Sequence, residues 1–133
     1  MARIFITLFL ILTFLGSLTY AQNHARFRDF KAGMTDENLV KQALKIANER
    51  ALNLRCPETY TKGIILSYNW INELDKNGFV NARRIHIELY SERPDGRCAI
   101  ADYTFKQKHE IDDVFSKKLI FEKVGGSYFV NCE

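Results

Sequence analysis

The chain has 133 residues, of which 47% are hydrophobic and 26% charged, enough apolar content for one globular domain with a buried core. Its 19 Lys and Arg residues only slightly outnumber its 16 Asp and Glu residues, for a net charge of +3, and charges of both signs alternate along the chain without a basic block. Proteins that bind nucleic acid usually concentrate basic residues in one patch. The composition therefore argues against a nucleic-acid-binding protein.

The first 21 residues have the layout of a secretion signal. Arg3 supplies a short positive start, residues 4–15 form a run dominated by Ile, Leu and Phe, and Ala21 places a small residue at the expected cleavage position. A membrane-spanning helix needs about 20 apolar residues, which is more than this run offers. We therefore expect removal of residues 1–21, a single domain over residues 22–133, and a secreted protein, extracellular or periplasmic, without a membrane segment.

A long amphipathic helix is predicted next. Thr35 is a good N-cap residue, and Asp36 and Glu37 follow it in the first turn, where negative charge complements the helix dipole. Apolar residues then recur at helical spacing over residues 39–54, and Pro57 prevents the helix from continuing. Polar residues on the opposite face indicate that one side of this helix packs on another element.

From residue 64 onward the apolar period changes to two, which predicts an antiparallel sheet. The expected strands are residues 64–70, 85–90, 99–105 and 115–124, with a closing strand at 128–132. Turn residues separate them at Asn77-Gly78, Pro94-Asp95-Gly96 and Gly125-Gly126. We therefore predict an α+β fold in which one long amphipathic helix packs on a curved antiparallel sheet of four to five strands.

Residues 64–74 also allow a second interpretation. Their apolar residues fit one face of a helix that Asn77-Gly78 would end. Aromatic and β-branched residues dominate the segment and favour a strand. The choice matters, because a second helix before the sheet would indicate a different family of folds.

The chain has three cysteines, Cys56, Cys98 and Cys132. In an oxidising compartment we expect one disulfide and one thiol that is either left over or joined to another chain, which would give a homodimer. The three are scattered without a close pair, so a zinc site is not expected. The spacing does not decide the connectivity, and nothing in the sequence implies a metal or another cofactor.

One group of side chains suits proton transfer. His86, Glu88 and Tyr90 point to the same side of a predicted strand, where a carboxylate can orient a histidine that titrates near neutrality. The alternative is a solvent-exposed polar face, which the alternation of a half-buried strand produces by default. We favour this alternative and predict no catalytic residue, so the protein is not expected to be an enzyme.

The segment of residues 32–44 resembles the glycine-plus-helix opening of the cystatins. The order of elements is also similar: a short N-terminal strand (here residues 27–30), a glycine (Gly33), a long helix and an antiparallel meander. Cystatins block papain-like proteases by inserting an N-terminal glycine and two hairpins into the active-site cleft. The corresponding hairpins here would be residues 75–79 and 109–113, which lack the family's Gln-x-Val-x-Gly motif and Pro-Trp pair, so only Gly33 carries over.

These observations favour a secreted binding protein, with inhibition of an extracellular or periplasmic hydrolase or protease as the specific hypothesis. Its partner would be another protein. We expect the contact surface to comprise Gly33, Asn77, Gly78 and Phe79, because an aromatic at a hairpin tip can anchor a partner. The opposing interpretation of Phe79 is that it folds back into the buried face of the next strand.

The alternative function is that of a domain resembling the nuclear transport factor 2-like superfamily. Such a domain would enclose a small-ligand pocket or an isomerase-type site. We expect it to show a helix over residues 64–74 and a deep pocket lined by Tyr68, Tyr103 and an acidic residue.

Overall fold

The computed structural model describes residues 33–131 of the chain. The predicted signal, the strand expected at residues 27–30 and Cys132 lie outside these residues. In the part that is described, no helix combines the length and the apolar character needed to cross a membrane.

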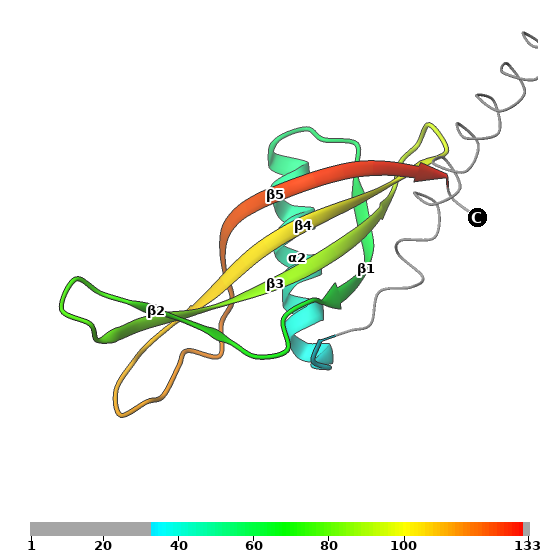
Figure 1. Ribbon diagram of the computed structural model, residues 1–133. Coiled ribbons are helices and arrows are strands. Elements are labelled where there is room, and N and C mark those ends of the chain that lie inside the picture. The colour runs from blue at the N-terminus through cyan, green and yellow to red at the C-terminus, as the bar shows by residue number, and fades with distance from the viewer. Residues whose placement is uncertain (1–32, 132–133) are drawn as a thin grey trace, which may run out of the picture. The chain divides into compact units, whose positions relative to one another are not determined.

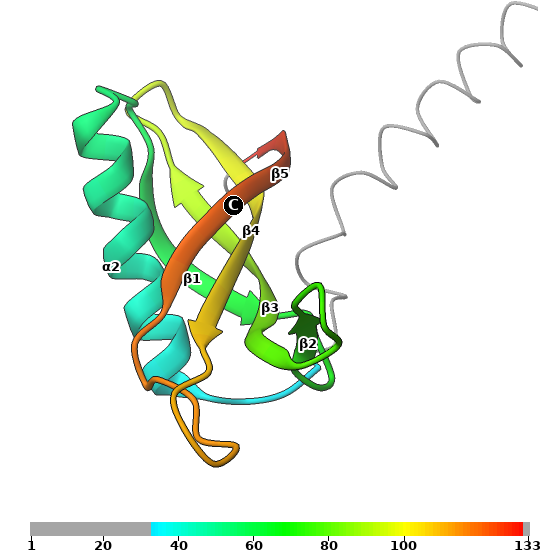
Figure 2. The same ribbon diagram turned by 90° about the vertical axis from the view of Figure 1, so that its left-hand side faces the viewer.

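The described residues form one helix and five strands (Figure 1). Their bounds are α2 Glu37–Asn53, β1 Thr59–Ile65, β2 Ile71–Leu74, β3 Val80–Glu92, β4 Arg97–Lys108 and β5 Ile120–Asn131. All paired strands are antiparallel, in the order β1-β3-β4-β5, with β2 pairing with another part of β3. Figure 2 shows α2 along one side of the curved sheet. This is the predicted α+β arrangement.

The helix begins one residue later than its predicted cap implies. The N-cap is Asp36, whose side chain accepts a hydrogen bond from the Leu39 amide at 3.0 Å, and not Thr35. Both residue types cap helices well, so the sequence alone did not separate them. The buried face consists mainly of alanines, which allow the helix axis to lie close to the sheet; its members are Leu39, Ala43, Ala47 and Ala51.

The core lies between this helix face and the sheet. The strand positions predicted to face inward are buried, and they include Ile85, Ile87, Leu89, Ala101, Tyr103 and Phe105. From β1, Tyr60 meets Tyr103 edge to face, and the Tyr103 hydroxyl donates to the Tyr60 hydroxyl at 3.2 Å. The period-two interpretation of β3 and β4 is therefore confirmed.

Residues 64–74 contain no helix, but the strand predicted at residues 64–70 is wrong in its bounds. They are shared between β1 and β2, which leave an irregular link at residues 66–70. At the start of the link Leu66 N donates to His86 O at 2.9 Å, and the Ser67 hydroxyl then accepts from His86 N at 3.0 Å. A side-chain oxygen thus takes the place of a backbone carbonyl at this point. β1 therefore covers Thr59–Ile65, earlier than the predicted strand, and a second strand starts at Ile71.

The turns at Asn77-Gly78 and Pro94-Asp95-Gly96 are confirmed. Gly78 and Gly96 have φ angles of 84° and 79°, in the left-handed region that glycine adopts without a steric penalty. In the first, Gly78 N donates to Asp75 O at 3.0 Å and Asp75 N to Phe79 O at 2.8 Å. The loop is therefore a three-residue connection with glycine in the bulge position.

The turn predicted at Gly125-Gly126 is wrong. β5 continues through both glycines to Asn131, so one strand, Ile120–Asn131, stands where two strands were expected. The register between β4 and β5 shifts between Ala101, which pairs with Ser127, and Tyr103, which pairs with Val124. The two glycines lie in this irregularity, between Val124 and Ser127. A Cβ atom on Gly125 would lie 3.3 Å from the Asp102 Cβ atom. Glycine in a strand marks a bulge or a close backbone approach, which by sequence looks the same as a turn.

Candidate functional site

Two loops project from one end of the sheet (Figure 1). One is the β2–β3 hairpin tip, residues 75–79, and the other is the β4–β5 loop, residues 109–119. They start side by side because Ala82 pairs with Lys108 and His109 N donates to Asn81 O at 3.0 Å. We call these two segments, together with Leu74, the two-loop end.

The two-loop end exposes large apolar side chains on both of its loops. The exposed fractions are 58% for Leu74, 71% for Phe79, 71% for Ile111 and 54% for Val114. Phe79 therefore points to solvent, and the interpretation that buries it in the next strand is wrong. An exposed apolar group of this kind, rimmed by polar residues, is typical of an interaction surface.

The hairpin tip is held by its own first residue. Asp75 Oδ1 accepts hydrogen bonds from the backbone amides of Asn77 at 2.8 Å and Phe79 at 3.0 Å. A carboxylate that accepts amides two and four residues ahead fixes the turn locally. Asn77 and Gly78 thus shape the tip, and Phe79 is presented at its base.

The second loop contains a tight turn at residues 111–114. Val114 N donates to Ile111 O at 3.0 Å, and the two residues between them, Asp112 and Asp113, have φ angles of 54° and 59°. Positive φ at both central positions is the signature of a type I′ turn, which aspartate tolerates better than most residues. Ile111 and Val114 flank this turn. The resemblance to the cystatins implied a hairpin at residues 109–113, but neither apolar residue was predicted as a contact. Their position beside the Asp-Asp pair is the signal that would have indicated them.

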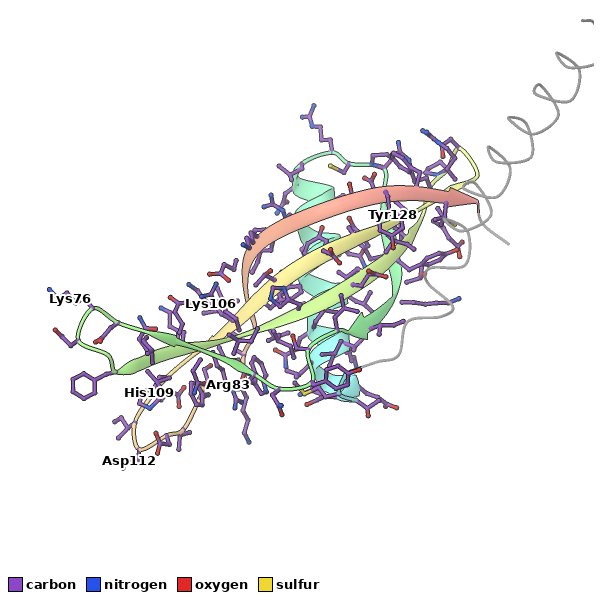
Figure 3. All side chains as sticks on the ribbon, viewed as in Figure 1. Lys76, Arg83, Lys106, His109, Asp112 and Tyr128 are labelled. Atoms are coloured by element: carbon purple, nitrogen blue, oxygen red, sulfur yellow. The ribbon has the colours of Figure 1, made fainter. Side chains whose placement is uncertain are left out.

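Arg83 connects the bases of the two loops (Figure 3). Its guanidinium lies between the rings of Trp70 and Phe115, 4.2 Å and 4.4 Å from their centroids. Its Nε and Nη2 atoms donate to Gln107 Oε1 at 3.0 Å and 2.7 Å. Partial burial lowers the pKa of this guanidinium from its usual value, yet arginine stays charged in proteins. His109 meets Phe115 edge to face and extends the stack. No local pattern in the sequence indicates this arrangement.

Gly33 does not lie at the hairpin tip with the other three predicted contact residues. Its amide donates to Ile65 O at 2.8 Å, at the end of β1. A Cβ atom at this position would clash with the backbone oxygens of Leu66 and Ser67. Gly33 thus packs on the link between β1 and β2, whereas Asn77, Gly78 and Phe79 form the hairpin tip.

His86, Glu88 and Tyr90 on β3 do not form the solvent-exposed face that was expected. Glu88 is only 3% exposed, so the expectation is wrong at this residue. The register places Asp102 opposite Glu88 and Thr104 opposite His86. His86 Nδ1 lies 3.2 Å from the Thr104 hydroxyl. The described neighbour of this histidine is thus a hydroxyl on the next strand.

The pocket required by the alternative function is not formed from the residues named for it. Tyr68 is 72% exposed on the link between β1 and β2, whereas Tyr103 is buried between helix and sheet. A different cavity of about 360 Å³ lies between the start of α2 and β1. Its apolar lining comes from Met34, Val40, Leu44, Gly63 and Ile65, and Thr35, Asp36, Glu37 and Lys41 complete it.

Two of the three cysteines lie in the described residues. Cys56 follows the helix as a free, exposed thiol. Cys98 is fully buried on β4, where the Tyr90 hydroxyl lies 2.9 Å from its sulfur atom. Across residues 33–131, no group of His, Cys, Asp and Glu is arranged to hold a metal ion.

No protein-family model matches the chain, and no curated protein and no solved structure is detectably similar to it.

Proposed function

We propose that this protein is a secreted protein-binding module that engages its partner through the two-loop end. The observation that supports this is the exposure of four large apolar side chains on two adjoining loops. Single exposed apolar residues are common on soluble proteins, but a group at one projecting end is not. The signal-like character of residues 1–21 supports the secreted location.

The partner that we propose is an extracellular or periplasmic hydrolase, which the protein would inhibit. Enzyme clefts are concave, and two neighbouring projections are suited to enter one. Both loops are ordered by internal contacts, Asp75 in the hairpin and the Arg83 stack at the base. Loops that are already ordered lose less conformational entropy on binding.

The substitution Phe79→Ser tests this surface. We expect it to weaken binding by at least about 2 kcal/mol, roughly 30-fold, because aromatic anchors dominate such interfaces. The measurement is calorimetric titration and inhibition of a papain-like protease, a trypsin-like protease and lysozyme by the protein comprising residues 22–133. Leu52→Ser is the matched control, since Leu52 is 78% exposed at the far end of α2. Equal affinities of the two variants, or no binding to any enzyme, would contradict the proposal.

A second candidate function is the binding of a small apolar ligand in the cavity between α2 and β1. Its volume and mainly apolar lining support this. The discriminating experiment is displacement of a fluorescent fatty acid. A ligand in this cavity would be lost with Leu44→Trp, which fills it, and kept with Phe79→Ser. The opposite pattern would place the binding site at the two-loop end.

We also propose that the disulfide expected from the sequence joins Cys98 and Cys132 and leaves Cys56 as the odd thiol. Cys56 is an exposed free thiol, whereas Cys98 is buried on β4 and pairs with Val130, which stands two residues before Cys132 in the sequence. Alkylation of the protein denatured without reductant is then expected to label one thiol, Cys56, whereas alkylation after denaturation and reduction labels all three. Mass spectrometry of the peptides gives the result, and a label on Cys98 before reduction would contradict the pairing. A covalent dimer that disappears with Cys56→Ser would show that the odd thiol joins two chains.

A further inference from the structure

We infer that the two-loop end also pairs two copies of this chain, related by a two-fold axis that passes between its loops. The inference goes beyond the proposed function, because this pairing needs no enzyme. In a symmetric contact of this kind the same surface of both copies takes part, so the hairpin tip of one copy faces the second loop of the other. The surface must therefore be complementary to itself, both in charge and in apolar character.

The two-loop end is neutral when its charges are summed. Its two loops and the residue directly before the second hold four carboxylates and four lysines, namely Asp75, Glu110, Asp112 and Asp113, and Lys76, Lys108, Lys117 and Lys118. Like charges that face each other across an interface are strongly unfavourable. An excess of one sign would therefore keep two copies apart, and this end carries no such excess.

The two signs are separated between the tips of the two loops. Figure 3 shows Lys76 and Asp112 at the tips of separate projections. Both side chains are exposed, and so is that of Asp113, the second central residue of the type I′ turn. Among residues 33–131, no ion pair involves any of these three side chains. One tip thus presents a cation and the other presents two carboxylates.

The lysines at the end of the second loop lie away from this turn, at the base of the loop beside α2. Lys117 O accepts a hydrogen bond from Gln42 Nε2 at 3.2 Å, and Leu119 N donates to Gln42 Oε1 at 3.0 Å. Gln42 belongs to α2, so these contacts fix residues 117–119 against the helix. The carboxylates of the turn are therefore the charges that the second loop presents at its tip.

The exposed apolar side chains are divided between the loops in the same way. Leu74 and Phe79 lie on the hairpin, and Ile111 and Val114 lie on the second loop. A two-fold axis between the loops brings each apolar pair against the other pair in the second copy, and each cationic tip against an anionic turn. Because a symmetric interface repeats every contact, both kinds of contact occur twice. A second copy of this chain therefore matches the surface in charge and in apolar character.

The pairing and the proposed contact with an enzyme use the same side chains. Phe79 cannot enter a cleft while a second copy covers it, so the two events exclude each other. The dimer protects the apolar group from water, and dilution releases the binding surface by mass action.

This contact differs from a disulfide that joins two chains through Cys56. Cys56 shortly precedes β1, whose first residue, Thr59, pairs with Glu92 at the end of β3. The hairpin tip leads into the other end of β3, at Val80. The two possible contacts thus lie at opposite ends of the sheet, and Cys56→Ser removes the covalent one without touching the two-loop end.

Sedimentation velocity over a concentration series tests the inference, with the protein comprising residues 22–133 and carrying Cys56→Ser. We expect a dimer whose dissociation constant lies below about 1 mM, the weak end of specific association. Lys76→Glu should weaken it at least about tenfold, because repulsion replaces attraction in both copies of the contact. Lys45→Glu is the matched control, since it reverses an exposed charge on α2 and should leave the dissociation constant unchanged.

The decisive measurement uses two variants with opposite charge reversals. Asp112→Lys with Asp113→Asn should weaken the dimer as Lys76→Glu does. In an equal mixture of the two variants, the introduced glutamate of one faces the introduced lysine of the other, and the second contact keeps its original charges. We therefore expect the mixture to associate within about threefold of the unchanged protein, although neither variant does so alone.

Circular dichroism and urea unfolding establish that each variant is folded. Asp112 has a positive φ angle, which lysine adopts less readily than aspartate. Should Asp112→Lys disturb the turn, Glu110→Lys carries the same reversal at an exposed residue outside the positive-φ positions.

Two results would overturn the inference and leave the proposed function in place. One is a protein that stays monomeric up to about 1 mM. The other is a mixture of the two reversed variants that associates no better than either alone, since the two loops then do not face each other. A dimer that behaves as expected, in a protein that binds no enzyme, would instead contradict the proposed function and support the inference.

Discussion

Replacement of Phe105 by alanine is expected to lower the free energy of unfolding by about 3–5 kcal/mol. Phe105 is fully buried on β4, and its ring stacks on that of Tyr103 with 5.8 Å between the centroids. The substitution removes most of a large side chain from the layer between helix and sheet. Because close-packed neighbours relax only in part, a cavity remains in addition to the lost apolar burial. Urea unfolding followed by fluorescence and circular dichroism measures the change.

Phe79→Ala provides the control for this result, since it makes the same chemical change at a side chain that is 71% exposed. Its effect on the free energy of unfolding should stay within about 0.5 kcal/mol, as for most surface substitutions. A loss comparable to that of Phe105→Ala would place Phe79 in the core and remove it from the proposed contact surface. Together the two variants separate stability from binding.

The elements that the sequence predicted well are those with a strong local period. Ile85, Ile87 and Leu89 alternate with polar residues in the middle of β3, and each of the three is buried. The helix likewise shows its apolar face over four turns, so a one-residue uncertainty at its cap changed nothing in the packing. Periodicity is set by the geometry of each element itself, which is why it can be read without the rest of the fold.

The elements that were missed depend on a partner strand. Gly125-Gly126 is compatible with a hairpin and with a bulge, and the choice follows from β4, which continues far enough to pair on both sides of the glycines. The break between β1 and β2 has the same origin, because Ser67 reaches the His86 amide only once β3 lies beside it. Such contacts are long-range in sequence and leave no local pattern.

The residues of the candidate site likewise fall into those with a local sequence signal and those that depend on strand pairing. Phe79 was predicted because the Asn-Gly turn and the aromatic stand next to each other in the sequence. Ile111 and Val114 are lone apolar residues in a polar segment, and their loop starts beside the hairpin only because Ala82 pairs with Lys108. Arg83 reads as an ordinary polar residue of a strand, although it stacks between two rings that are distant in sequence.

Arg83→Ala is expected to cost about 2–5 kcal/mol of unfolding free energy. Two cation–π contacts of about 0.5–1 kcal/mol each are lost. Gln107 is 3% exposed, and its Oε1 atom would lose both of its donors, which leaves a buried acceptor unsatisfied at a further cost of about 1–3 kcal/mol. Arg83→Lys is the informative control, because it keeps the charge but cannot donate through a planar fork. Urea unfolding should therefore rank the lysine variant between the unchanged protein and the alanine variant.

The same substitution tests whether the two loops act as one surface. The Arg83 guanidinium contacts Trp70 at the base of the hairpin and Phe115 in the second loop. Without it, the backbone amides of Val114 and Ser116, which donate to Ile111 and Lys108, should exchange hydrogen faster. Affinity for the partner should fall as well, because loops that are no longer ordered must be fixed on binding. Faster exchange with unchanged affinity would show that the partner engages the loops independently. Unchanged exchange would show that Arg83 does not hold them together.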